Sequence, residues 1–107
     1  MRAAADRREL AIATLDQLRR LQNDIALELA DRDRPGLADR IAWRVRKIRE
    51  ALHELDADRA LVSLRDLRDD WEALRAPGRR PKALLRSISD RVAEIRAALG
   101  CEANPLW

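Results

Sequence analysis

The sequence has few of the residues from which active sites are built. Among its 107 residues there are one histidine, one cysteine and neither tyrosine nor phenylalanine. Nucleophilic catalysis needs a nucleophile, a base beside it and a third group that orients the base. With so little of this material, we expect a protein that is not an enzyme and that uses no cofactor, metal ion or small-molecule substrate.

Cysteine pairs and long apolar runs are also lacking. The single cysteine, Cys101, excludes an internal disulfide and fits a reducing compartment. The chain begins with charged residues rather than the apolar core of a signal peptide, and no stretch approaches the roughly 20 apolar residues of a membrane span. We therefore expect a cytoplasmic protein without membrane contact.

Glycine, proline and aromatic residues are scarce as well. Three glycines and four prolines leave little room for a turn-rich β fold. Charged residues make up 38% of the chain and aromatic residues 3%, so a core must come from leucine, isoleucine, valine and alanine. This composition is typical of helical bundles, and the length fits one domain. We expect a single all-α domain over residues 1–107.

Apolar residues recur at spacings of three and four, the period that places side chains on one face of a helix. They predict helices at about residues 4–31, 35–55, 58–75 and 81–99. The four apolar stripes are Leu15, Leu18, Leu21, Ile25 and Leu29; Leu37, Ile41, Val45, Ile48, Leu52 and Leu55; Leu61, Leu64, Leu67, Trp71 and Leu74; and Leu85, Ile88, Val92, Ile95 and Leu99. Leu10, Ile12 and Leu27 should widen the first. Four such helices joined by short loops predict an antiparallel four-helix bundle.

Two prolines and a glycine mark expected helix ends. Pro35 and Pro81 suit the first turn of a helix, because proline lacks the N–H that is unpaired there anyway. Gly100 stands where a left-handed residue would end the last helix.

The connection between the second and third helices is less strongly marked. The stripe changes phase there, which predicts a tight turn at residues 56–58 with Asp56 or Asp58 as a helix cap. Because neither glycine nor proline enforces this turn, one bent helix over residues 35–75 is the alternative.

Basic residues gather in the predicted second helix. The net charge is only +3, but residues 40–49 hold five basic side chains and no acid. Arg40, Arg44 and Lys47 repeat at i, i+4 and i+7, which predicts a basic ridge beside the apolar stripe. Trp43 falls nearly opposite the centre of that stripe, so we expect it to face outward and to stack on a base or anchor a protein partner.

A second basic segment begins the predicted last helix, where the unpaired N–H groups of a helix start also favour a phosphate. Together the two segments predict a nucleic-acid-binding surface formed by Arg40, Arg44, Arg46, Lys47, Arg79, Arg80, Lys82 and Arg86. All of the 22 basic residues except Lys47 and Lys82 are arginine, which codon bias in a GC-rich genome would also produce. The alternatives are a solvated face and a surface that binds an acidic protein partner.

The only histidine, His53, has no second histidine or cysteine near it in sequence, so we interpret it as a solvated side chain rather than a metal ligand. Its spacing from Arg46 resembles the signature of the helical HEPN ribonucleases, which would imply action of both residues on an RNA backbone. Lys47 stands where that signature usually has a polar residue, and the spacing arises by chance in arginine-rich helices. We keep the non-catalytic interpretation.

In length, expected helices, basic segments and lack of catalytic residues, the chain resembles the small helical subunits of multi-subunit CRISPR effector complexes. No single motif carries the resemblance. It implies a non-catalytic subunit that contacts the backbone of RNA or single-stranded DNA within a nucleoprotein assembly and associates with neighbouring copies, with Trp43 and Trp107 at the partner interface. The alternative is a helical protein-interaction module, such as a homodimer, adaptor or inhibitor, without nucleic-acid contact.

Overall fold

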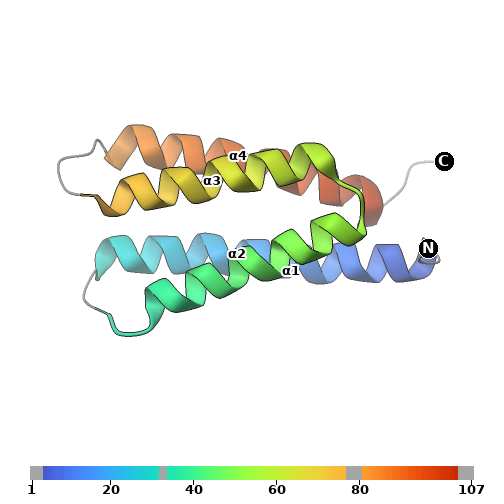
Figure 1. Ribbon diagram of the computed structural model, residues 1–107, viewed down its shortest axis with the longest axis horizontal. Coiled ribbons are helices and arrows are strands. Elements are labelled where there is room, and N and C mark those ends of the chain that lie inside the picture. The colour runs from blue at the N-terminus through green and yellow to red at the C-terminus, as the bar shows by residue number, and fades with distance from the viewer. Residues whose placement is uncertain (1–3, 32–33, 77–80, 104–107) are drawn as a thin grey trace.

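The computed structural model describes residues 4–31, 34–76 and 81–103, which form four α-helices and no strand. The helices are α1 (Ala4–Ala30), α2 (Leu37–Glu54), α3 (Asp58–Arg75) and α4 (Pro81–Ala103). Figure 1 shows two antiparallel hairpins, α1 with α2 and α3 with α4, that lie against each other. The predicted all-α four-helix bundle is confirmed. None of the helices described is both long and apolar enough to cross a membrane.

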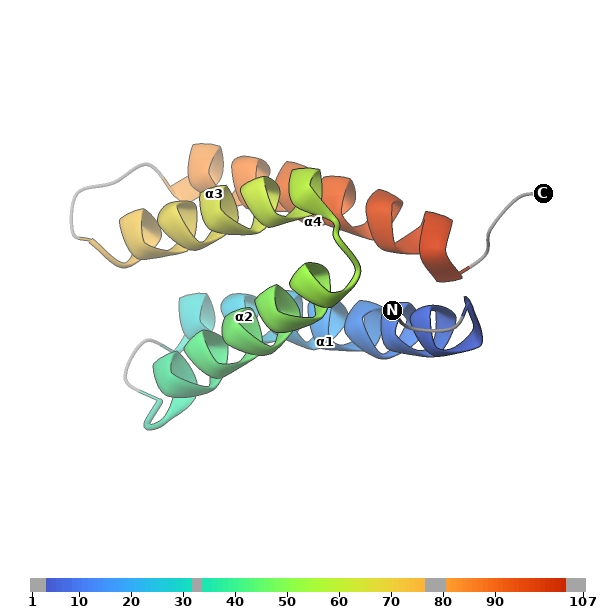
Figure 2. The same cartoon turned by 45° about the vertical axis from the view of Figure 1, so that its right-hand side comes forward.

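Each helix packs against the helices that precede and follow it around the bundle. The contact between α3 and α4 is the most extensive, α1 packs equally on α2 and α4, and α2 contacts α3 least among these pairs. Figure 2 shows that α2 and α3 meet at their connecting turn and diverge away from it. The seam between α2 and α3 is therefore the most open of the four.

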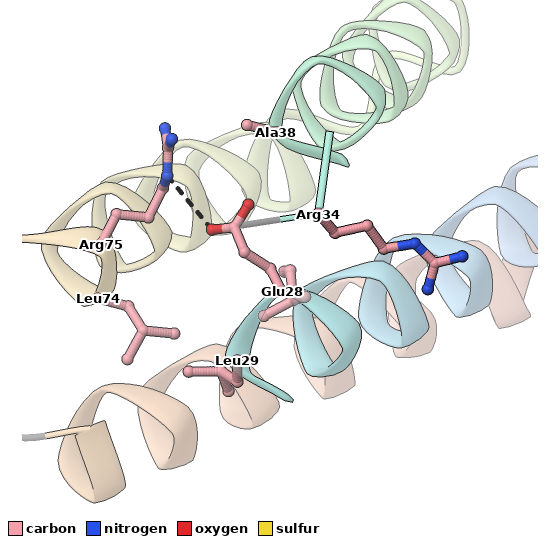
Figure 3. Close-up of a pocket in the computed structure, with 7 residues that line it drawn as sticks. Glu28, Leu29, Arg34, Ala38, Leu74 and Arg75 are labelled. Carbon is pink, nitrogen blue, oxygen red and sulfur yellow. Dashed lines mark ion pairs between the residues drawn. The ribbon is translucent and has the colours of Figure 1, made fainter. Parts of the chain in front are cut away.

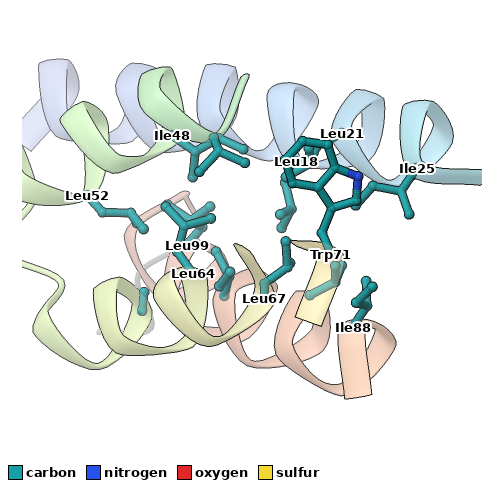
Figure 4. Close-up of a cluster of buried hydrophobic side chains, with 14 of the residues drawn as sticks. Leu18, Leu21, Ile25, Ile48, Leu52, Leu64, Leu67, Trp71, Ile88 and Leu99 are labelled. Carbon is teal, nitrogen blue, oxygen red and sulfur yellow. The ribbon is translucent and has the colours of Figure 1, made fainter. Parts of the chain in front are cut away.

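The predicted stripe of α2 forms one wall of a single core. All of its members are at most 5% exposed: Leu37, Ile41, Val45, Ile48, Leu52 and Leu55. Figure 4 shows Ile48 and Leu52 above Leu64 and Leu99, with Trp71 reaching toward α1. Full burial of one such aliphatic side chain contributes about 1.5–3 kcal/mol, so these stripes supply most of what holds the helices together.

Three apolar side chains lie outside the core, contrary to the sequence-based expectation. Ile12, Leu27 and Leu85 are 50%, 38% and 37% exposed. In α4 the neighbouring Leu84 packs against the core in place of Leu85. In α1 the apolar face is wider than the surface that α2 and α4 cover, so Ile12 and Leu27 remain on the outer side.

The turn between α2 and α3 closes on a left-handed residue. Asp56 has a φ of 54°, and its N–H donates to the carbonyl of His53 at 3.1 Å. The N–H of Ala57 donates to the carbonyl of Leu52 at 3.0 Å. These two bonds form the Schellman motif that satisfies the last carbonyls of a helix. The predicted turn is confirmed, one residue earlier at 55–57, and the single bent helix is wrong.

The helix cap predicted for this turn is wrong. The N-cap of α3 is Ala57, which makes no side-chain capping hydrogen bond, and Asp58 is already the first residue of the helix. Asp56 takes the left-handed position at the end of α2 and so cannot cap α3.

Two further helix ends differ from expectation. α2 begins at Leu37 rather than Pro35, because Gly36 adopts a left-handed φ of 78° before the helix starts. α4 does not end at Gly100 but continues to Ala103. Gly100 therefore keeps a helical backbone, and the apolar contact of Ala103, which is 3% exposed, extends the helix past it. The predicted start at Pro81 is confirmed.

Arg7 joins three helices at the end of the bundle that holds the α2–α3 turn. Its guanidinium donates to the backbone carbonyl of Leu55 at 2.9 Å and to the carboxylate of Glu102 at 2.6 Å. The hydrogen bond to Glu102 raises the pKa of Arg7. A cation is favourable at the end of α2, where the carbonyls carry partial negative charge.

Candidate nucleic-acid interface

The expected basic ridge of α2 does not face solvent as a unit. Arg40 and Arg44 turn toward α1 and share one carboxylate, with Arg40 Nη2 3.0 Å from Asp24 Oδ1 and Arg44 Nε 2.7 Å from Asp24 Oδ2. Arg44 also donates to Gln17 Oε1 at 2.7 Å. The side chains of Asp24 and Arg44 are only 7% and 13% exposed.

These contacts correct the expectation for Arg40 and Arg44. Arg44 lies mostly covered in the α1–α2 interface, where it neutralises the buried carboxylate of Asp24, so its guanidinium is not free to meet a phosphate. Arg40 keeps a side-chain exposure of 44% but is held by the same carboxylate. Replacing either residue would disturb the packing of α1 on α2 as well as any ligand contact.

Trp43 and Lys47 lie on the outer side of α2. Trp43 is 42% exposed, as its position opposite the apolar stripe predicted. Lys47 Nζ lies 5.8 Å from the centroid of the indole ring and Arg44 Cζ lies 5.9 Å from it. Lys47 also forms a loose, exposed ion pair of 3.6 Å with Glu50.

A groove runs between α2 and α3, along the most open seam of the bundle. Its first part is a hollow of about 170 Å³ lined by Ala42, Val45, Arg46 and Arg49 of α2 and by Arg68, Trp71 and Glu72 of α3. The second part, nearer the turn, has a volume of about 280 Å³ and is lined by Val45, Arg49, His53, Leu61, Val62, Leu64, Arg65 and Arg68. The two parts share Val45, Arg49 and Arg68, and we call them together the α2–α3 groove.

Four arginines line this groove, two from each helix. Arg46 and Arg49 have no ion-pair partner among the residues that the structure describes. On the other wall, Arg68 lies 3.3 Å from Glu72 and Arg65 lies 3.8 Å from Asp66. Because Arg65 and Arg68 are 70% and 51% exposed, these pairs hold them only weakly.

Of these four arginines, only Arg46 was predicted from the sequence as a binding residue. Arg49, Arg65 and Arg68 carry a recognisable signal, since each helix places two arginines three residues apart and therefore on one side. Which side of α2 meets α3 depends on the order of the helices around the bundle, which the spacing alone does not give.

The other predicted cations are not part of the groove. Lys82 and Arg86 are exposed on the first turns of α4, and neither lines the α2–α3 groove. Arg79, Arg80 and Trp107 lie outside the described residues. Among the described residues, the structure therefore does not place Lys82 and Arg86 of the second predicted segment in the groove that Arg46 lines.

His53 is exposed to solvent and lines the second part of the groove. Arg46 lines the first part, with Arg49 between them. The described residues contain no group of three or more histidine, cysteine, aspartate or glutamate side chains placed to hold a metal ion.

A separate pocket of about 210 Å³ lies near the end of α1, lined by Ile25, Glu28, Leu29, Arg34, Ala38, Leu74 and Arg75. Figure 3 shows the carboxylate of Glu28 directed at Arg75, with Leu29 and Leu74 below it. Glu28 accepts from the indole of Trp71 at 3.1 Å and pairs with Arg75 at 3.3 Å. Its charge is satisfied within the fold, so we assign this pocket a structural role.

The chain matches no protein-family model, no curated protein and no solved structure. Its function is therefore inferred from the side chains of the α2–α3 groove and its surroundings.

Proposed function

We propose that this chain is a non-catalytic helical module that contacts the phosphate backbone of nucleic acid through the α2–α3 groove. One observation carries the proposal: Arg46 and Arg49 of α2 and Arg65 and Arg68 of α3 line the same groove. Arginine is suited to this role because its planar guanidinium can bind two phosphate oxygens at once.

The local charge of the groove supports phosphate contact in spite of the modest net charge of +3. Glu72 is the acidic residue among its lining side chains, so four guanidiniums share the groove with one carboxylate. Arg46 and Arg49 are exposed and form no ion pair with another described residue. Contacts of this kind position a strand and do not read its sequence.

The proposal extends to a larger nucleoprotein assembly, as the resemblance to small CRISPR effector subunits implies. A groove with four arginines spans few phosphates, so a single copy should bind weakly. Adjacent copies aligned along one strand would join their grooves into a longer basic surface. Sedimentation velocity with strands of increasing length should then show several copies on one strand.

The test compares binding of labelled RNA and DNA strands by the wild type and by an Arg46→Glu/Arg49→Glu variant at low salt. Neither residue is paired in the described fold, so the variant should keep its helicity and unfolding midpoint. We expect fluorescence anisotropy to show an affinity lower by about a hundredfold or more, because two charge-assisted contacts at about 1.5 kcal/mol each amount to about 3 kcal/mol.

A matched control separates local contact from overall charge. An Arg8→Glu/Arg59→Glu variant makes the same change in net charge at two exposed side chains, one on α1 and one on α3, that line neither part of the groove. It should bind much more tightly than the groove variant. Equal losses in the two variants would mean that no specific surface is used and would refute the groove as the binding site.

A protein-interaction module is the second candidate, favoured by the apolar part of the same groove. Val45, Leu61, Val62 and Leu64 line its larger hollow, and Val62 is 49% exposed. An apolar floor with basic side chains around it also fits an amphipathic helix that carries acidic residues. A partner of this kind should bind with less dependence on salt than a polynucleotide does, because apolar burial supplies part of its affinity, and a Val62→Asp variant should lose it.

A further inference from the structure

Trp43 is an exposed tryptophan beside a basic groove. Its side chain is 42% exposed, whereas Trp71 is 5% exposed and donates its N–H to Glu28. Trp71 thus has a place in the core, and Trp43 has none. An exposed aromatic side chain beside cationic residues is an arrangement that single-strand-binding surfaces use.

The position of Trp43 on α2 relates it to the groove. Ala42, its neighbour in the chain, and Arg46, almost one turn further on, both line the first part of the groove. At about 100° per residue, Arg46 lies roughly 60° around the helix from Trp43. Trp43 itself lines neither part of the groove, and its ring lies against Lys47 and Arg44, so the indole stands on the outer face of α2, next to the groove wall that Ala42 and Arg46 form.

The surroundings of the indole favour a negatively charged strand. Two cations lie within 6 Å of the ring centroid, Lys47 at 5.8 Å and Arg44 at 5.9 Å, and because Asp24 holds Arg44, Lys47 is the one that can meet a phosphate. The side chain of Lys47 is 46% exposed, so its ammonium can move from Glu50 to a phosphate. Proteins that bind single strands combine a basic groove with an aromatic side chain on which a base stacks.

We infer that Trp43 stacks on an unpaired base of the strand whose phosphates lie in the α2–α3 groove, so that this surface selects single-stranded over duplex nucleic acid. The inference rests on the proposed function. In a duplex each base is already stacked and paired, so both interactions must be broken, at a cost in free energy, before a base is exposed. The phosphates of a duplex can still meet the arginines, but its bases cannot reach the indole without that cost.

The experiment measures the affinity of the wild type and of Trp43→Leu for a single strand, for a duplex of equal length and for a strand with abasic sites. Base stacking is worth on the order of tenfold in affinity for one base. We expect the wild type to prefer the single strand and Trp43→Leu to lose that preference. A Trp43→Phe variant should restore part of it, and the abasic strand should bind both proteins alike.

Leu85→Ala is the matched control. Leu85 is an apolar side chain of α4 that is 37% exposed, and it lines neither part of the groove. It should leave the preference unchanged. Circular dichroism checks that each variant keeps its helicity.

The possible results separate the two proposals. If wild type and Trp43→Leu bind single strand and duplex equally, while Arg46→Glu/Arg49→Glu binds neither, the stacking inference is overturned and the proposed function stands. If Trp43→Leu loses only self-association in sedimentation velocity, Trp43 is a protein contact and the inference is again overturned. If the wild type binds no polynucleotide at low salt, both proposals fall.

Discussion

Asp24 organises the interface between α1 and α2. Its buried carboxylate accepts hydrogen bonds from both Arg40 and Arg44, and Arg44 is itself 13% exposed. By contrast, Asp16 on the same helix pairs with Arg19 and Arg20 at the surface, and the hydrogen bond from Arg19 lowers the pKa of Asp16. Each carboxylate pairs with two arginines, but only Asp24 is buried. Its ion pairs should therefore contribute more to the stability of the fold than those of Asp16.

An Asp24→Ala variant tests this difference. The substitution leaves the buried guanidinium of Arg44 without its carboxylate, and breaking a buried pair in this way costs about 3–5 kcal/mol. We expect the free energy of unfolding in urea to fall by about 3 kcal/mol, since Arg40 remains partly solvated. Asp16→Ala is the control and should scarcely shift the midpoint; a similar shift in both variants would contradict the importance of burial.

The four helices follow from their apolar stripes, but their ends depend on backbone contacts that the stripes do not contain. The stripe of α2 was predicted in full because each of its members meets another helix. The prediction for Asp56 was wrong because two backbone hydrogen bonds decide the left-handed turn at the end of α2. The prediction for Gly100 was wrong because the burial of Ala103 favours a helix that continues beyond Gly100. Local sequence alone gives weak preferences at such positions.

The left-handed backbone of Asp56 predicts a stabilising substitution. Glycine adopts a φ of 54° without strain, whereas a residue with a Cβ is disfavoured there. We expect Asp56→Gly to raise the free energy of unfolding by about 0.5–1 kcal/mol. Asp56→Val should lower it instead, because a branched side chain disfavours this region. Thermal unfolding of both variants would show the two opposite shifts, and shifts of equal sign would contradict the turn described.

A Gly100→Ala substitution tests whether α4 ends at Gly100 or continues to Ala103, because the two cases predict changes of opposite sign in the unfolding midpoint. Within a helix, alanine stabilises relative to glycine by about 0.5–1 kcal/mol, and a Cβ at this position meets no atom within 4 Å. We therefore expect Gly100→Ala to raise the unfolding midpoint. A left-handed cap at Gly100 would make the same substitution destabilising, so a lowered midpoint would refute the helix that continues to Ala103.

For the molecule as a whole, the fold was predictable from the sequence and the binding surface only in part. The predicted outward position of Trp43 agrees with the structure because it depends on the phase of a single helix. The roles of Arg40 and Arg44 depend on which neighbour covers their side of α2, and the α2–α3 groove depends on two helices at once. The basic surface predicted from one helix therefore becomes, in the folded chain, an internal ion-pair cluster and a separate groove.

Phosphate contact in the α2–α3 groove is tested most directly by the salt dependence of binding to a single strand. Each phosphate contact contributes about −0.7 to the slope of log K against log salt concentration, so four arginines predict a slope of about −3. We expect this slope for the wild type and about half of it for Arg46→Glu/Arg49→Glu, measured by anisotropy over a salt series. A slope near zero for the wild type, or an equal slope for both proteins, would contradict phosphate contact through this groove.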